Sequence, residues 1–573
     1  MHDFQPGANA MPLNKILNIV LHPVALTAIS LCGILFIARM DNSSMTVLYC
    51  IATVLFIASL AYVLSGRLGF SILLAWFLVG FLTVVSTLKY KIKGFSLHFY
   101  DFVMVAEDRE VASFLLDSYP MLALPVLGLA IACIAGAVML FRCDKRQTIR
   151  LPHRFAGALA AAMVLKLTFP AEASAEQRYF YYLQGRHVSA FFVSLLDLQY
   201  MFASNDFEKR IAGMAPEAPF SGDVDCGNGQ RPDIIVVLEE SMTDPAIFPE
   251  MPHGKAISRR MQGAADTFKP LFVETFGGGT WISNLSLMTG LSATDFGWRS
   301  PYLTMMLEGK VRGALPEMLS QCGYRTAAIL PLNYTFVNEG PFLSSIGFET
   351  VLDRYDIGAS SYHMRDAFYF DAASQFVEGH REQDERPLFL LVQTMIAHSP
   401  YEEALLPGVQ PDAASLDPDP QTAEYLRRMV IGRQDFETFA ARETARKQDR
   451  GLIVMSFGDH QTYVTLDHAK RLSGEDALAR PRSMAYRTFY TVSPQTGATA
   501  PAPIDIAYLS TALLDAAGIP GSDVFKDLRR LAGHCGGRFH DCPDRAGVDR
   551  HIARRIAGGL LDLGGDDAAA PGS

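Results

Sequence analysis

Long apolar stretches fill the first third of the chain and are scarce in the rest. Five of them approach the roughly 20 residues that an α-helix needs to cross a bilayer, and they lie at 16–37, 45–64, 70–88, 121–140 and 155–169. The fifth is the shortest, is rich in alanine and contains Lys166. The pattern predicts a membrane domain of about five α-helices over residues 1–170.

A basic loop between the fourth and fifth stretches predicts the orientation of this domain. It holds one acid, Asp144, and five basic residues, Arg142, Lys145, Arg146, Arg150 and Arg154. Because such clusters stay in the cytoplasm, we expect a multi-pass membrane protein whose chain after about Ala171 lies outside the cytoplasm. The loop 89–119 then lies outside although it begins with Lys89, Lys91 and Lys93, an exception that we ascribe to function.

A different pattern begins near residue 171. Residues 178–202 are aromatic and amphipathic, which predicts a helix that lies along the membrane surface or packs on the next domain. Residues 215–231 are rich in proline, glycine and acids, as in a linker. We therefore expect an interfacial helix and linker over 171–230, a catalytic domain over 231–520 and a C-terminal extension over 521–573.

Continuous apolar runs alternate with helical segments within 231–520. The runs are DIIVVL, YRTAAILPL, PLFLLVQTM, GLIVMSF and RTFYTVS, which begin at residues 233, 324, 387, 451 and 487. Runs that are apolar on both faces are typical of buried strands, and their alternation with helices is typical of parallel sheets. The pattern predicts an α/β domain with a mostly parallel sheet covered by helices, and a ligand site beyond the carboxyl ends of its strands.

Charge and cysteine content change this picture little. The formal net charge of −10 argues against nucleic acid as a partner. Of the eight cysteines, Cys226, Cys322, Cys535 and Cys542 would face an oxidising compartment. Cys535 and Cys542 bracket a short loop that contains glycine, so they could form a disulfide or remain free thiols.

Side chains that can bind a metal follow two of the predicted strands. Glu239 and Glu240 end the first, and Asp459 and His460 follow the fourth. An Asp–His pair offers oxygen and nitrogen ligands that suit Zn²⁺ or Mn²⁺. Because neighbours on a strand point to opposite faces, we expect only one of the two glutamates to bind the metal. A solvated strand end is the alternative for the two glutamates, and a solvated loop is the alternative for the Asp–His pair.

Thr280 follows three glycines at 277–279 and precedes a segment with helical spacing that stops at Gly290. We expect a helix that starts at Thr280, so that the hydroxyl, or a phosphate bonded to it, faces unpaired backbone amides. An ordinary N-cap threonine is the alternative. With the carboxylates and the Asp–His pair, a divalent metal could make this hydroxyl a nucleophile toward a phosphoester.

The order of short motifs along the chain resembles that of the alkaline-phosphatase and sulfatase superfamily: ES at 240–241, GxT at 278–280, HSPY at 398–401 and GDH at 458–460. It resembles more narrowly the membrane branch that contains lipoteichoic acid synthases and the phosphoglycerol transferases of periplasmic glucans. The resemblance implies that one divalent metal ion (Mn, Zn or Mg) is bound by Glu240, Thr280, Asp459 and His460, with Thr280 also the nucleophile. It implies substrate contacts by His398, Asn333 and Asn338.

The activity that this resemblance implies is transfer of a phospholipid headgroup, phosphoglycerol, from a membrane phospholipid donor to an extracytoplasmic glycan or lipid acceptor. A phospho-threonine would be the intermediate. The stretch TWISN at 280–284 lacks the C/S-x-P-x-R motif that sulfatases convert to formylglycine, so we do not expect sulfate-ester hydrolysis by that route. Two alternatives stay open: a phosphoethanolamine transferase acting on lipid A or a glycan, and a non-catalytic membrane-anchored binding or sensing protein.

Overall fold

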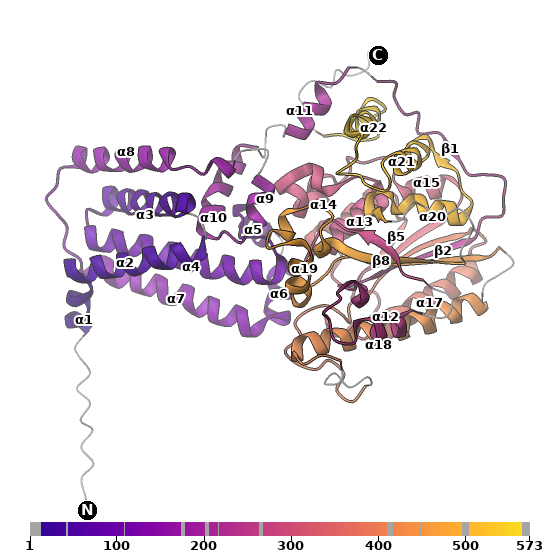
Figure 1. Ribbon diagram of the computed structural model, residues 1–573, viewed down its shortest axis with the longest axis horizontal. Coiled ribbons are helices and arrows are strands. Elements are labelled where there is room, and N and C mark those ends of the chain that lie inside the picture. Colours follow the sequence, from indigo (N-terminus) through magenta and orange to yellow (C-terminus); the bar gives the residue numbers. More distant parts are fainter. Residues whose placement is uncertain are drawn as a thin grey trace, which may run out of the picture. The chain divides into compact units, whose positions relative to one another are not determined.

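The computed structural model describes residues 13–41, 44–107, 109–173, 178–200, 206–215, 217–262, 267–409, 416–446, 450–494 and 503–563. The chain divides into two compact units, drawn together in Figure 1. The first contains residues 1–91, 95–103 and 119–199, and the second contains 92–94, 104–118 and 200–573. Two short pieces of the loop between the third and fourth apolar stretches therefore belong to the second unit.

Among the residues that the structure describes, four helices are long and apolar enough to cross a membrane: α2 (Pro23–Met40), α3 (Ser44–Ser65), α4 (Leu68–Lys93) and α7 (Pro120–Cys143). The fifth predicted span forms α8 (Leu151–Leu167), which has 17 residues. At 1.5 Å per residue this helix is about 26 Å long, short of the roughly 30 Å hydrocarbon core. Four of the five predicted spans thus have the length and composition required.

Residues 178–200 form two short helices of the first unit, α9 (Arg178–Tyr182) and α10 (Val188–Ser194), followed by a 3₁₀ turn, and not the single predicted helix. The break between them is stabilised by the buried carboxylate of Asp41. This carboxylate accepts hydrogen bonds from the backbone amides of His187, Val188 and Ser189 at 2.7, 3.0 and 2.9 Å. It thereby satisfies amides at the start of α10 that no helical carbonyl can reach.

The second unit is built on an eight-stranded sheet. Its strands, in spatial order, are β5 (Thr350–Leu352), β4 (Arg325–Ile329), β6 (Leu388–Gln393), β2 (Asp233–Glu239), β7 (Leu452–Gly458), β8 (Arg487–Ser493), β3 (Lys269–Phe272) and β9 (Ile504–Asp505). The first five are parallel, and β8 is antiparallel to both neighbours. All five predicted runs are strands, so the mostly parallel sheet is confirmed; the short β3, β5 and β9 were not predicted.

Helices cover both faces of this sheet, as Figure 1 shows, and the predicted α/β class is confirmed. One face carries α12 (Gly254–Met261), α17 (Asp366–Gln383) and α18 (Pro420–Arg446), and the other carries α13 (Thr280–Thr289), α15 (Leu315–Gln321) and α20 (Leu509–Ala517). The central strands β2, β6 and β7 are buried along their whole length. This double burial explains why their sequences are continuously apolar.

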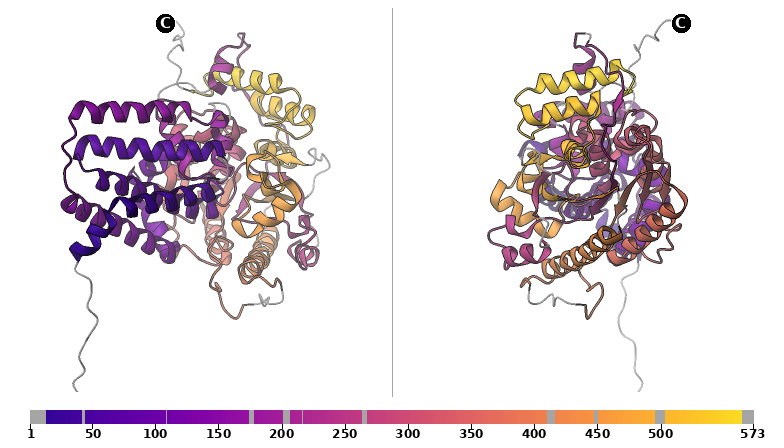
Figure 2. Two further views of the ribbon diagram at one scale, coloured as in Figure 1. Left: turned by 60° about the vertical axis from the view of Figure 1, so that its left-hand side comes forward. Right: turned by 90° about the vertical axis from the view of Figure 1, so that its right-hand side faces the viewer.

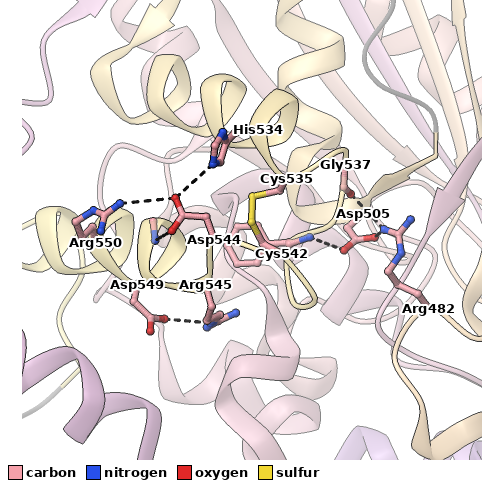
Figure 3. Close-up of a disulfide and its surroundings, with 12 residues drawn as sticks. Arg482, Asp505, His534, Cys535, Gly537, Cys542, Asp544, Arg545, Asp549 and Arg550 are labelled. Atoms are coloured by element: carbon pink, nitrogen blue, oxygen red, sulfur yellow. Dashed lines mark hydrogen bonds and ion pairs between the residues drawn. A yellow bond between two sulfur atoms is a disulfide. The ribbon is translucent and has the colours of Figure 1, made fainter.

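The C-terminal extension belongs to the second unit. Its strand β10 (Gly521–Ser522) pairs with β1 (Val224–Asp225) of the predicted linker, and α21 (Asp523–His534) and α22 (Arg545–Ala557) lie together in both views of Figure 2. Figure 3 shows the disulfide between Cys535 and Cys542, a pairing that their spacing left open. A second disulfide joins Cys226 to Cys322. The predicted linker is therefore held to the domain at two places.

The remaining helices of the described residues are short. They are α1 (Leu13–Val20), α5 (Phe99–Glu107), α6 (Arg109–Ser118), α11 (Asp206–Ala212), α14 (Leu303–Met306), α16 (Glu339–Ser345) and α19 (Leu466–Ser473). Of these, α6 and α16 contribute to the surroundings of the candidate site.

Candidate active site

Three neighbouring strands place the candidate residues at one edge of the sheet. β2 lies between β6 and β7, and Glu239 pairs in register with Gly458. The residues that follow, Glu240 and Asp459, therefore leave the sheet side by side. The turn after β6 leads to His398 and is shaped by Asp366, whose carboxylate accepts hydrogen bonds from the amides of residues 395 and 396 at 3.0 and 2.9 Å.

The structure brings together four of the predicted site residues. The Thr280 hydroxyl donates a hydrogen bond to Glu240 Oε2 at 2.8 Å. His460 Nε2 lies 3.4 Å from both Glu240 Oε1 and Asp459 Oδ2. Ligand atoms of Glu240, Asp459 and His460 all lie within 4.8 Å of one another, and these three residues are buried while Thr280 is half-buried. We call Glu240, Asp459 and His460 the donor cluster, because each offers a donor atom to a metal ion. The nucleophile candidate Thr280 is accessible at the edge of this buried cluster.

The donor cluster fits a divalent cation. Among the residues that the structure describes, Asp459 Oδ2 and His460 Nε2 are buried without a hydrogen-bond partner. His460 Nδ1 lies 3.0 Å from the carbonyl oxygen of Gln461, which can only accept, so Nδ1 carries the proton and Nε2 presents a lone pair. Buried lone pairs that point toward one another without a hydrogen-bond donor between them are energetically costly. Two carboxylates, an imidazole and a hydroxyl suit Zn²⁺ or Mn²⁺.

The charges of the cluster oppose one another. Burial raises the pKa of Asp459 well above its ordinary value, and the nearby charge of Glu240 raises it further. Burial also acts to raise the pKa of Glu240, but His460, His398 and hydrogen bonds from Ser241 and Thr280 outweigh it and lower that pKa. Burial lowers the pKa of His460, which keeps its ring neutral. A cation would relieve the repulsion between the two carboxylates.

Glu239 faces away from the cluster. Its Oε1 accepts a hydrogen bond from Arg433 Nη1 of α18 at 2.5 Å, and both side chains are almost fully buried. The adjacent Glu240 instead contacts Thr280 and His460. The two glutamates thus point in different directions, as their neighbouring positions predict.

The glycine triplet adopts backbone angles, and allows close approaches by neighbouring atoms, that a residue with a Cβ atom would disfavour. Gly277, Gly278 and Gly279 have φ angles of 68°, 135° and 93°. A Cβ atom on Gly277 would lie 2.0 Å from the carbonyl oxygen of Ile92, and one on Gly278 would lie 1.8 Å from Lys93 Nζ. Helix α13 then begins at Thr280 with Gly279 as its N-cap and ends before Gly290, as predicted. Because Gly279 holds the N-cap position, the Thr280 hydroxyl is directed to Glu240.

His398 is half-buried beside the cluster. Its Nδ1 contacts the carbonyl oxygen of Ser399, and its own carbonyl accepts a hydrogen bond from Arg428 at 2.8 Å. The Phe114 ring of α6 meets the His398 ring edge-on, with centroids 5.6 Å apart. Burial is the main cause that lowers the pKa of His398 to about 4, so the ring is neutral at pH 7.

Asn333 and Asn338 make local contacts. Asn333 Oδ1 accepts hydrogen bonds from the amide and hydroxyl of Thr335, both at 2.9 Å. Asn338 Nδ2 donates to Glu308 Oε2 at 2.8 Å. These bonds shape the segment between β4 and α16, and the substrate contacts expected of both asparagines stay a prediction.

Glu339 is a site-supporting residue that the sequence did not predict. Its Oε1 accepts hydrogen bonds from Asn284 of α13 at 2.7 Å and from Gln393 of β6 at 2.8 Å. Burial raises its pKa to about 7. The carboxyl group therefore ties the nucleophile helix to the strand that leads toward His398. Asn284 lies one helical turn after Thr280, and Gln393 ends a buried strand; polar residues at buried positions are the signal that could have indicated such a partner.

Comparison with known protein families matches residues 232–519, half of the chain, to the sulfatase family. The chain belongs to this family. The matched region covers the sheet from β2 and all four clustered residues.

Two curated relatives match part of the chain. An uncharacterized protein of Haemophilus influenzae is 24% identical over 313 residues, which are 52% of this chain and 55% of the relative. A putative cyclic β-1,2-glucan modification protein of Rhizobium meliloti is 26% identical over 245 residues, which are 40% of this chain and 36% of the relative. The chain thus spans about half or less of the length of the curated relatives it matches.

Solved structures include similar chains. The Streptococcus pyogenes phosphoglycerol transferase GacH, in complex with sn-glycerol-1-phosphate, has 17% identity and a TM-score of 0.43 over 58% of this chain and 87% of its own. The Neisseria meningitidis lipooligosaccharide phosphoethanolamine transferase EptA has 11% identity and a TM-score of 0.49 over 85% of this chain and 98% of its own. These low values add no argument about activity.

Substitution of the two adjacent glutamates should separate stability from metal binding. We expect Glu240→Gln to lose bound Zn²⁺ or Mn²⁺, because it removes a ligand charge. We expect Glu239→Gln to keep the metal but lose about 3 kcal/mol of stability, because Arg433 stays buried without its counter-charge. Metal content per chain and thermal unfolding in EDTA measure the two effects. Metal loss in Glu239→Gln with full retention in Glu240→Gln would contradict the assignment.

Stability should depend on pH through Glu339. Its pKa is raised from an ordinary 4.5 to about 7, so the folded chain keeps a proton that the unfolded chain releases between these values. The stabilisation is complete below pH 4.5 and is lost as the pH rises through about 7. We expect Glu339→Gln to match the wild type near pH 5 and to exceed it by about 3 kcal/mol near pH 8. Thermal unfolding across this range, with the exposed Glu382→Gln as control, tests this; a pH-independent difference would refute it.

Proposed function

We propose that this chain is a metal-dependent transferase that moves a phospholipid headgroup, phosphoglycerol, to an extracytoplasmic glycan or similar acceptor. The observation that carries the proposal is the half-buried Thr280 hydroxyl, hydrogen-bonded to Glu240 at the edge of a buried oxygen and nitrogen donor cluster. A hydroxyl held in this way suits attack on phosphorus.

The first step forms a bond between Thr280 Oγ and the phosphorus of the phospholipid and breaks the bond from phosphorus to the diacylglycerol oxygen. Before the reaction, the Thr280 hydroxyl proton is hydrogen-bonded to Glu240. In this step it ends on the hydroxyl of the released diacylglycerol. The headgroup remains on Thr280 as a phosphodiester. The group would lie at the amino terminus of α13, where the helix dipole favours negative charge.

Glu240, Thr280, Asp459 and His460 would hold the divalent ion, which supplies positive charge that favours the ionised hydroxyl and the phosphoryl oxygens.

In the second step the acceptor hydroxyl bonds to phosphorus and the bond to Thr280 Oγ breaks. Because the Nδ1 of His398 contacts a carbonyl oxygen, its neutral ring presents Nε2 as an acceptor. This nitrogen takes the proton of the incoming hydroxyl, and that proton is passed to Thr280 Oγ as it leaves, so that both side chains return to their starting state. His398 and His460 therefore differ in role, since only the second presents its lone pair to the cluster.

Four candidate membrane helices on the same chain support a lipid donor. A headgroup donor is presented at a bilayer surface, and we place the catalytic unit on the periplasmic or outer side of a bacterial inner membrane, where glycans are accessible. The relative described as a putative cyclic β-1,2-glucan modification protein supports a glycan acceptor. Phosphoglycerol and phosphoethanolamine donors share this chemistry and differ in the group left on Thr280.

A covalent adduct on Thr280 tests this function. The full-length protein in detergent with Mn²⁺ or Zn²⁺ should gain a headgroup phosphate on Thr280 when it is incubated with phosphatidylglycerol, because the hydroxyl is the attacking atom. Peptide mass spectrometry locates the group and gives its mass. Thr280→Ala should show no adduct and no diacylglycerol release, while Thr280→Ser should retain both.

Parallel incubation with phosphatidylethanolamine compares the two donors. An adduct from that lipid alone would replace phosphoglycerol by phosphoethanolamine in the proposal. Metal binding without any adduct or diacylglycerol release, unchanged in Thr280→Ala, would contradict transfer and favour a binding or sensing protein.

A further inference from the structure

Residues Ile92–Gly94, at the end of α4, pack against the loop that precedes the nucleophile candidate. The carbonyl oxygen of Ile92 lies where a Cβ on Gly277 would be, as its 2.0 Å approach shows. Gly94 adopts φ +65°, and a Cβ there would lie 3.0 Å from Phe276 and 2.8 Å from Leu478. These three residues belong to the second unit by their contacts. The close approach is a reason for glycines on both sides of the contact.

The Lys93 ammonium lies close to two residues that flank Thr280 in the sequence, Gly278 and Trp281. Its Nζ is 1.8 Å from the position of a Cβ on Gly278, two residues before Thr280, and 5.8 Å from the ring centroid of Trp281, the next residue. Its charge also acts to lower the pKa of both His398 and His460. The ammonium is therefore close enough to influence the two imidazoles that border the reacting position.

A second piece of the same loop, in α6, contacts His398. The Phe114 ring of α6 contacts the ring of His398, and it lies 5.2 Å from the rings of both Phe336 and Tyr362. Phe336 in turn lies 6.3 Å from Trp281. Residues of one loop thus contact both the glycine loop before Thr280 and the ring of His398.

The charge balance of the site leaves the negative charge of a bound phosphodiester for Lys93 to offset. The carboxylates of Glu240 and Asp459 offset the charge of a divalent ion, so the cluster with its ion is about neutral. A phosphodiester brings a further negative charge, and charge shifts onto the entering and leaving oxygens during transfer. A fixed ammonium next to the nucleophile would offset this charge.

We propose that Lys93 binds the phosphoryl oxygens of the transferred group, so that a residue of the loop between the third and fourth apolar stretches completes the active site. The inference rests on the proposed function for its substrate. It also gives a role to one of the three lysines that oppose the charge rule. Lys89 pairs with Asp101 at 2.6 Å and Lys91 is exposed, whereas Lys93 is half-buried at the glycine loop.

Phosphate binding by the full-length, Mn²⁺-loaded protein tests this role. Titration calorimetry with inorganic phosphate should show binding to the wild type that Lys93→Met weakens roughly 10- to 100-fold, because methionine keeps the apolar stem but removes the charge. Lys93→Arg should retain most of the affinity, and the neighbouring Lys91→Met should match the wild type. Equal affinity in Lys93→Met and wild type, or no phosphate binding by the wild type, would overturn the proposal.

Two further readouts separate this role from a structural one and from the function itself. Thermal unfolding and Mn²⁺ content of Lys93→Met should equal those of the wild type; if that variant unfolds, Lys93→Gln and Lys93→Arg are compared, and equal phosphate affinity of these two overturns the proposal. Headgroup transfer by Lys93→Met at wild-type kcat/KM would refute the role of Lys93 alone. Phosphate binding that depends on Lys93, in a wild type that transfers no headgroup, would refute the transferase and leave the anion site standing.

Discussion

The repulsion between two buried carboxylates is the constraint on which the site depends. Glu240 and Asp459 leave adjacent parallel strands side by side, in surroundings that exclude water. Placing two such charges together is unfavourable unless a cation or a proton offsets them. The unsatisfied Asp459 Oδ2 and His460 Nε2 point to a cation. The same electrostatic demand, extended to an incoming phosphodiester, accounts for a lysine at the glycine loop.

The rest of the catalytic unit can be understood as support for this cluster. Arg433 neutralises Glu239 on the far side of the strand, so only one of two adjacent acids faces the donor cluster. Ser241, with φ +58°, directs its amide to Asp459 Oδ1 at 2.8 Å. Ser283 of α13 donates to the carbonyl of Asp459 at 2.7 Å, and Glu339 links the same helix to β6. The helix that carries Thr280 is thereby tied to two of the three strands that form the site.

Much of this could be predicted from the sequence because the signals are local. Continuous apolar runs indicate β2, β6 and β7, and the glycines at 277–279 and Gly290 mark both ends of α13. Short strands such as β5, with three residues, carry too little pattern. The partners of Glu339 and the placement of Lys93 depend on contacts between segments far apart in the chain, which no local pattern contains. The fifth predicted span shows the converse: an apolar stretch indicates a helix, but a helix of 17 residues is short for a bilayer.

Anomalous X-ray scattering at the Mn or Zn edge, from crystals of the full-length protein grown with that ion, tests the central claim directly. The account predicts one strong peak within ligand distance of Glu240, Thr280, Asp459 and His460, about 2.0–2.3 Å from the donor atoms, and its loss in Glu240→Gln. A well-ordered site with no peak at saturating metal, or a peak bound elsewhere and unaffected by Glu240→Gln, would contradict it.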